Sequence, residues 1–154
     1  MSPDPREVAR GLLFDDEGRL LMVHWRDPVT GHEFLEPPGG RREPGETFED
    51  ALRREIREET GLEEVDVGDA ITQIDHRFTF GGDDFDCEEH YFACRLAGGT
   101  TSPTAFDPIE EAGIVGTEWV TLGDLMERPA DQVEPPQLFD MLRQLGHLDR
   151  EPWE

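Results

Sequence analysis

The sequence predicts an α/β protein in which helices pack on the faces of a mixed β-sheet. Short apolar runs bounded by turn residues lie before and after residues 48–60, a segment without glycine or proline. A second helical spacing of apolar residues closes the chain. Strands on both sides of a central helix favour this layered arrangement. The 154 residues fit one domain over 1–154, with 149–154 as a frayed tail.

Two apolar runs near the N-terminus predict a β-hairpin. Residues 8–14 and 20–25 flank the turn 15–18, which ends in glycine. A short extended piece is expected at 33–36. The segment 37–40 has the sequence PPGG, which cannot continue a helix, so a loop is expected to begin there.

The next element, residues 48–60, is predicted to be a helix. Thr47 followed by Asp50 resembles a capping box at its start. Neither glycine nor proline occurs before Gly61, which marks its end.

The second half of the chain predicts further strands and a last helix. Residues 70–80 and 88–96 have strand character and are expected to pair antiparallel across the turn 81–84. Residues 98–108 are expected to form a flexible loop, and 117–120 a short strand. The final helix is predicted from apolar residues at helical spacing, namely Leu138, Met141, Leu142 and Leu145.

The net charge of −23 excludes several classes of partner. The chain has 37 acidic and 14 basic residues, and every basic residue is arginine. A polybasic membrane anchor or a broad nucleic-acid surface needs clustered positive charge, which this composition disfavours. No apolar run approaches the roughly 18 residues of a membrane span, and the N-terminus has no apolar signal-peptide region. We therefore expect a cytoplasmic protein.

The two cysteines are expected to be free thiols. Cys87 and Cys94 lie on one predicted strand, about 23 Å apart at about 3.3 Å per residue, which is beyond the reach of a disulfide. Together with His90 they offer neither the number nor the pairing of ligands that a structural zinc site needs.

The predicted helix 48–60 carries carboxylates beside its apolar face. At 100° per residue, Glu55 and Glu59 fall on the border of the apolar stripe and Glu58 lies next to them. Carboxylates this close repel one another unless a cation lies between them, and Mg²⁺ prefers such oxygen ligands. The alternative is a solvated acidic face in a protein that is acidic throughout. The stripe itself consists of Phe48, Leu52 and Ile56.

The spacing of residues around this helix resembles the signature box of the Nudix hydrolases at every fixed position. Its positions are a glycine, a glutamate, an Arg-Glu-aliphatic triplet, a Glu-Glu pair and a Gly-aliphatic pair: Gly40, Glu46, Arg54-Glu55-Ile56, Glu58-Glu59 and Gly61-Leu62. The likeness extends to the PGG segment at 38–40 and to Glu118-Trp119-Val120 near the end.

This resemblance implies an α/β/α sandwich with a mixed β-sheet, and cleavage of a nucleoside diphosphate linked to a further group. It also implies that Glu55, Glu58 and Glu59, with the backbone carbonyl of Gly40, bind Mg²⁺, for which Mn²⁺ is a possible substitute. Arg54 corresponds to the family's orienting arginine. Glu46 corresponds to the partner of that arginine, which holds the loop to the helix.

The general base has several candidates, because members of the family use a glutamate of the box or one on a later loop. Glu58 or Glu55 is the first choice. The alternatives are Glu110 and Glu111, which follow the loop predicted at 98–108, and then Glu88 and Glu89 from a strand end. Each alternative taken alone is more often ordinary surface in a chain this acidic.

Substrate contacts are expected from a few cationic and aromatic residues near the box. Arg26, at the end of the second predicted strand, resembles the position from which many family members reach a phosphate. Arg77 and Arg41 are weaker candidates. For a nucleotide base the candidates are Phe34, Trp25 and His32, although an aromatic in a short strand is more often core. The other histidines are expected to be structural: His24, His76, His90 and His147.

The predicted function is hydrolysis of a nucleotide or nucleotide derivative by attack of water on phosphorus, aided by Mg²⁺. The expected partner is a small-molecule nucleotide, with no membrane and no broad nucleic-acid binding, in a monomer or homodimer. The alternative is a non-catalytic nucleotide-binding module of the same fold. Such modules are expected to lose box glutamates, and here all four remain.

Overall fold

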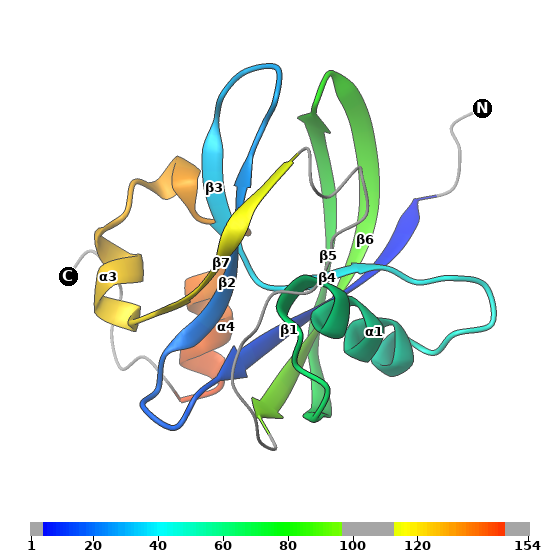
Figure 1. The fold of residues 1–154 in the computed structure, drawn as a ribbon, viewed down its shortest axis with the longest axis vertical. Helices are drawn as coiled ribbons and strands as arrows, with labels where there is room; N and C mark the ends of the chain where they lie inside the picture. The colour runs from blue at the N-terminus through cyan, green and yellow to red at the C-terminus, as the bar shows by residue number, and fades with distance from the viewer. Residues whose placement is uncertain (1–4, 97–112, 147–154) are drawn as a thin grey trace.

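Strands of one mixed sheet and a few helices make up the described part of the protein, which is residues 5–96 and 113–146 of a computed structural model (Figure 1). The strands are β1 (Arg6–Phe14), β2 (Leu20–Arg26), β3 (Glu33–Glu36), β4 (Gly39–Arg41), β5 (Val65–Phe80), β6 (Asp83–Leu96) and β7 (Ile114–Val120). The helices are α1 (Phe48–Thr60), α3 (Leu122–Glu127), the short 3₁₀ turn η1 (Ala130–Gln132) and α4 (Leu138–Gln144).

The sheet has the strand order β3-β2-β1-β6-β5, with β4 paired to β1 and β7 paired to β2. The β1–β6 pair is parallel, whereas β5 and β6 are antiparallel as predicted. The predicted N-terminal hairpin pairs at its turn, where Phe14 lies opposite Leu20. Beyond the turn, β2 runs beside β3 and β7, and β4 takes the place next to β1.

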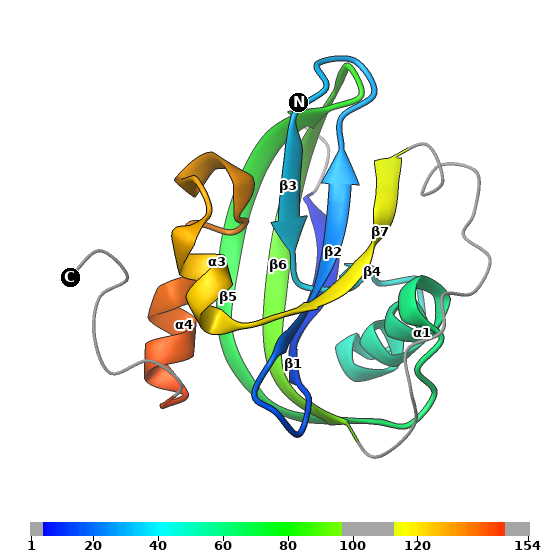
Figure 2. The same ribbon diagram turned by 60° about the vertical axis from the view of Figure 1, so that its left-hand side comes forward.

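Helices cover both faces of the sheet, so the predicted α/β class with a mixed sheet is confirmed. Figure 2 shows α1 on one side of the strands and α3 and α4 on the other. Successive residues of β1 face opposite sides. Leu12 packs in the cluster that contains Leu138 and Leu142 of α4, whereas Leu13 packs in the cluster that contains Leu52 of α1.

Helix α1 has the predicted bounds and the predicted cap. The hydroxyl of Thr47 accepts a hydrogen bond from the backbone N–H of Asp50 at 3.1 Å, which satisfies a free donor of the first turn. Gly61 ends the helix at φ 80°, a conformation that glycine adopts without strain. The last helix, α4, is also confirmed, with Leu145 just beyond its end.

Several boundaries differ from the prediction. Strands β5 and β6 begin earlier than predicted, at Val65 and Asp83, because exposed aspartates and glycines in these stretches resemble a turn although the backbone continues in the ladder. The short strand β4 (Gly39–Arg41) begins within the segment 37–40, where a loop was predicted to begin. Helix α3 was not predicted, and β7 begins at Ile114 rather than at residue 117. The segments 98–108 and 149–154 lie outside the described residues.

Both cysteines of β6 are free thiols, as predicted. Burial raises the pKa of Cys87 and raises that of Cys94 to about 12, so the reactive thiolate is scarce at neutral pH. We expect iodoacetamide at pH 8 to leave the native chain largely unmodified and to label both cysteines after unfolding. Intact-mass spectrometry measures this. Labelling of the native chain as fast as that of an unfolded control would contradict the buried placement.

Candidate metal and catalytic site

The PPGG segment lies directly against β1. Gly39 has φ 152°, and a Cβ atom there would lie 2.0 Å from the carbonyl oxygen of Ala9. On the neighbouring strand, the backbone N–H of Gly11 donates to the carbonyl of Pro38 at 3.0 Å. Because no side chain fits between the two backbones, glycine at this point lets the loop approach β1 closely.

Two glutamates of α1 reach this glycine loop from the helix side. The backbone N–H of Gly39 donates to Oε1 of Glu59 at 3.0 Å. The Glu55 carboxylate lies so close to Gly40 that a Cβ there would be 2.4 Å from its Cδ. Glu55 and Glu59 are 7% and 1% exposed, whereas the side chain of Glu58 is 41% exposed. Two carboxylates are therefore held inside and the third lies at the rim.

Arg54 contacts three acidic residues of this site: Glu46, Glu55 and Glu58. Its Nε and Nη2 donate to the two carboxylate oxygens of Glu46, each at 2.9 Å, and Nη2 also donates to the carbonyl of Arg41. Nη1 donates to Glu55 at 2.9 Å and lies 3.5 Å from Glu58. The hydrogen bonds from Arg54 lower the pKa of Glu46 to about 2. A bidentate ion pair between Arg54 and Glu46 thus links the loop to the helix.

The donors at this site fit a hard divalent cation in their chemistry. The carboxylates of Glu55, Glu58 and Glu59 and the carbonyl of Gly40 are all oxygen donors, which Mg²⁺ prefers. The buried carboxylates lie against Gly39 and Gly40, two positions at which a side chain larger than hydrogen would clash with its neighbours. Within residues 5–96 and 113–146, no three acidic, histidine or cysteine side chains already converge closely enough to enclose an ion. In this structure Arg54 is a cation that Glu55 and Glu58 share.

The candidate cationic substrate residues lie at the ends of strands or on an exposed strand face. Arg26 ends β2 and lies opposite Glu33 of β3. The side chain of Arg77 on β5 is 84% exposed and lies 3.6 Å from Asp86. Arg41 is exposed at the end of β4, next to the box loop.

The candidate aromatic residues form a cluster between the tips of two hairpins. Phe34 of β3 packs edge-on against Phe80 of β5 with ring centroids 6.2 Å apart. Trp25 contacts the same Phe80 ring edge-on at 5.7 Å, and His32 stacks on Phe34 at 5.8 Å. The half-buried Phe34 therefore joins the two hairpins, whatever else it contacts.

Glu89, one alternative base, lies in a buried ionic network that sequence reasoning missed. Its two oxygens accept hydrogen bonds from Nε of Arg10 and from the hydroxyl of Tyr91, each at 3.1 Å, and His76 lies 3.5 Å away. Burial acts to raise the pKa of Glu89, but Arg10 and His76 lower it to about 2. Burial raises the pKa of Glu36, which also contacts Arg10. A charged residue within the apolar run of β1 was the signal available in the sequence.

Glu88, another alternative base, pairs with a histidine of the same strand. The Glu88 carboxylate lies 2.8 Å from Nε2 of His90. Glu110 and Glu111 lie outside the described residues, as does His147.

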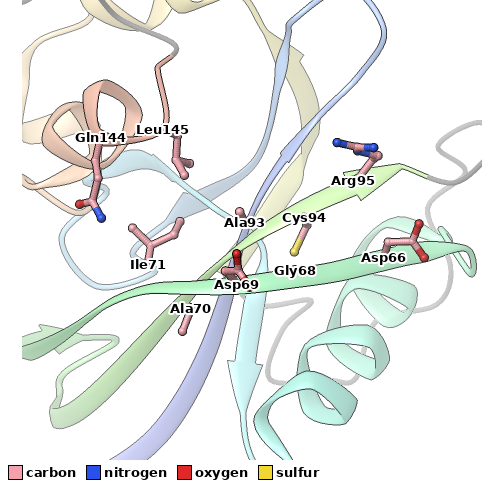
Figure 3. Close-up of a pocket in the computed structure, with 10 residues that line it drawn as sticks. All are labelled: Asp66, Gly68, Asp69, Ala70, Ile71, Ala93, Cys94, Arg95, Gln144 and Leu145. Carbon is pink, nitrogen blue, oxygen red and sulfur yellow. The ribbon is translucent and has the colours of Figure 1, made fainter.

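A pocket of about 520 Å³ lies elsewhere, between the start of β5, the end of β6 and α4 (Figure 3). Asp66 and Asp69 of β5, Arg95 of β6 and Gln144 of α4 line it. None of the box glutamates lines this pocket, although all of them are among the described residues. The site on α1 therefore lies outside this pocket.

We expect Arg54→Lys to lower activity although the lysine keeps the positive charge. A lysine cannot bridge both oxygens of Glu46 and also reach Glu55, because it lacks the planar fork of arginine. We predict that turnover falls by about 10- to 100-fold while the melting temperature changes little. Steady-state kinetics and thermal unfolding measure this, with Arg53→Lys on the same helix as control. Wild-type kinetics in Arg54→Lys would show that the fork has no role.

Comparisons with known proteins agree with these observations. A family model described as the NUDIX domain matches residues 4–142. An 8-oxo-dGTP diphosphatase of Haemophilus influenzae is 36% identical over 56 residues, which are 36% of this chain and 41% of that protein. An ADP-ribose pyrophosphatase of Methanocaldococcus jannaschii is 43% identical over 58 residues, 38% of this chain and 33% of that protein. These matches span less than half of each relative.

Solved structures show a similar fold over nearly the whole chain. A MutT protein from Methanosarcina mazei superposes with a TM-score of 0.65 at 16% identity, covering 98% of this chain and 100% of that one. A NUDIX hydrolase from Nitrosomonas europaea superposes with a TM-score of 0.66 at 20% identity, with the same coverage.

Proposed function

The chain belongs to the Nudix family, and on this basis we propose that it is a metal-dependent pyrophosphohydrolase. It cleaves a nucleoside diphosphate linked to a further group by attack of water on phosphorus. The observation that carries the proposal is the arrangement on α1: the buried carboxylates of Glu55 and Glu59 lie against a glycine loop, and Arg54 joins Glu55 to Glu58 at the rim.

In this proposal the box glutamates hold Mg²⁺, with Mn²⁺ as a substitute. Glu55, Glu58 and Glu59 and the carbonyl of Gly40 are the ligands. An ion held by these residues would supply positive charge to the diphosphate and would make the attacking water more acidic. Arg54 keeps Glu55 and Glu58 oriented and, with Glu46, keeps the loop against the helix. A local cation site of this kind lets a chain with a net charge of −23 bind an anionic substrate.

The geometry favours Glu58 as the general base. Its carboxylate is at the rim, where a substrate and its attacking water have access, whereas Glu55 is buried and held by Arg54. Glu89 is a poor base, since both of its oxygens accept hydrogen bonds and its pKa is about 2. Glu110 and Glu111 remain the alternatives.

The substrate proposal is limited to a nucleotide or nucleotide derivative. The two relatives are named for a nucleoside triphosphate and for ADP-ribose, both of which contain a nucleoside diphosphate. Arg26 and Arg77 are proposed to contact phosphate, and Phe34 the base. Among the described helices, none is long and apolar enough to cross a membrane. A cytoplasmic monomer or homodimer is part of the same proposal.

A turnover screen with Mg²⁺ tests the proposal. The panel contains dGTP, 8-oxo-dGTP, ADP-ribose, a UDP-sugar and a dinucleoside tetraphosphate, with Glu58→Gln as the matched variant. We expect at least one substrate to be cleaved much faster by the native protein than by the variant, and EDTA to abolish cleavage. Binding of a nucleotide without cleavage would instead support the non-catalytic binding module.

A further inference from the structure

Arg10 of β1 is a buried cation next to the glycine loop. It is 8% exposed in a chain where most charged residues lie at the surface. A buried charge is tolerated only when it is paired and hydrogen-bonded. Its Nη1 lies 3.2 Å from Glu36 and its Nε 3.1 Å from Glu89. These carboxylates raise the pKa of Arg10, although burial alone lowers it.

The remaining polar contact of Arg10 is with the loop itself. Nη1 donates to the carbonyl of Pro37 at 3.2 Å. In the β1–β4 ladder, Arg10 also lies opposite Gly39. Its side chain projects to the face of Leu12, which packs towards α4, whereas α1 covers the other face. The loop is thus held by Arg10 from one side and by the helix carboxylates from the other.

The carboxylate partners of Arg10 are themselves fixed. Glu89 is held by the hydroxyl of Tyr91, which lies on the same strand and opposite Arg10 in the β1–β6 register. Glu36 is the last residue of β3, immediately before Pro37. The guanidinium therefore joins β3, the loop and β6 through three contacts, and a shift of the guanidinium would break at least one of them.

We propose that Arg10 is a positioning residue for the glycine loop, residues 37–40. It fixes the backbone of this loop against α1. The Gly39 N–H can then donate to Glu59, and the Gly40 carbonyl is placed to bind the metal. The metal part of this inference rests on the proposed function. The positioning part concerns this chain's backbone alone and is measured without metal.

The test uses Arg10→Lys and Arg10→Met, with Arg19→Met as a charge-matched control. Arg19 pairs with Asp15 at 2.7 Å in the β1–β2 turn, far along β1 from the loop. Lysine keeps the charge but cannot contact Glu36, Glu89 and Pro37 together. The double variant Arg10→Met/Glu89→Gln removes one of the two carboxylates that lose Arg10, so the net charge of the cluster returns to its original value, and folding recovers if charge imbalance is the only defect.

Two readouts are compared in the 154-residue chain. By amide hydrogen exchange without metal, we expect the Gly39 N–H to lose protection in the Arg10 variants, while the Gly61 N–H at the end of α1 keeps it. By Mn²⁺ titration followed by electron paramagnetic resonance, without nucleotide, we expect affinity to fall about 10- to 100-fold, also in the double variant. Arg19→Met should match the wild type in both.

Unchanged protection of the Gly39 N–H in folded Arg10→Lys overturns the positioning role. If the double variant binds Mn²⁺ as tightly as the wild type, Arg10 contributes only to folding, and the positioning role is again overturned. Failure of the wild-type protein to bind Mn²⁺ contradicts the proposed function and the metal part of the inference. In that case the exchange result still decides whether Arg10 positions the loop.

Discussion

Glu58→Gln is expected to lower kcat by about 10²- to 10⁴-fold. The carboxylate at the rim of α1 is proposed both to ligate Mg²⁺ and to accept the proton of the attacking water, and an amide does neither well. Because the side chain is 41% exposed and its contact with Arg54 is 3.5 Å long, folding should be nearly unaffected. Steady-state kinetics with the best substrate of the panel, together with thermal unfolding, measures both quantities.

A matched control lies on the same helix. The Asp50 side chain is 63% exposed and lies 3.5 Å from Arg53, so Asp50→Asn makes the same chemical change outside the proposed site. We expect kcat close to the wild-type value in this control. If Glu58→Gln loses no more activity than Asp50→Asn, Glu58 is neither the base nor an essential ligand, and Glu110 or Glu111 becomes the next residue to replace.

Gly39→Ala is expected to lower the free energy of unfolding by about 3 kcal/mol. At φ 152°, the new Cβ would lie 2.0 Å from the carbonyl oxygen of Ala9 and 2.8 Å from the Cα of Arg10. Both are backbone atoms, so no side-chain rotation relieves the clash, and the β1–β4 pairing must open. Urea unfolding measures the loss.

The neighbouring Gly40→Ala provides the contrast. Its Cβ would meet the end of the flexible Glu55 side chain at 2.4 Å, and that side chain can rotate away. Stability should therefore fall by only about 1 kcal/mol, the scale of an unfavourable rotamer, while metal affinity is lost with the Glu55 ligand. Equal destabilisation by the two variants would contradict the distinction between backbone and side-chain contacts.

The part of the site on α1 was predictable because it is local in sequence. The cap at Thr47, the bounds of the helix and the inward border position of Glu55 and Glu59 follow from 3.6-residue periodicity and capping chemistry. The pairing of Arg54 with Glu46 followed from the family resemblance and agrees with the ion pair in the structure. The predicted mixed sheet with helices on its faces is likewise observed.

The unpredicted features depend on contacts between distant segments. Strand β4 exists because β2 diverges from β1 and leaves an edge for the loop, which no local pattern encodes. The polar starts of β5 and β6 are strands because each one pairs with the end of the other strand. The Arg10 network joins residues 79 positions apart, Arg10 and Glu89, so it is visible only once the sheet is assembled.

Hydrolysis in ¹⁸O-labelled water tests the central claim most directly. With Mg²⁺ and the best substrate of the panel, mass spectrometry of the two products shows where the water oxygen goes. A pyrophosphohydrolase that works by attack of water on phosphorus should place one ¹⁸O atom on a phosphate of a single product, at a rate that falls in Glu58→Gln. Products without label on any phosphate, or release equally fast with Glu58→Gln, would contradict the proposed reaction and the role of the α1 carboxylates.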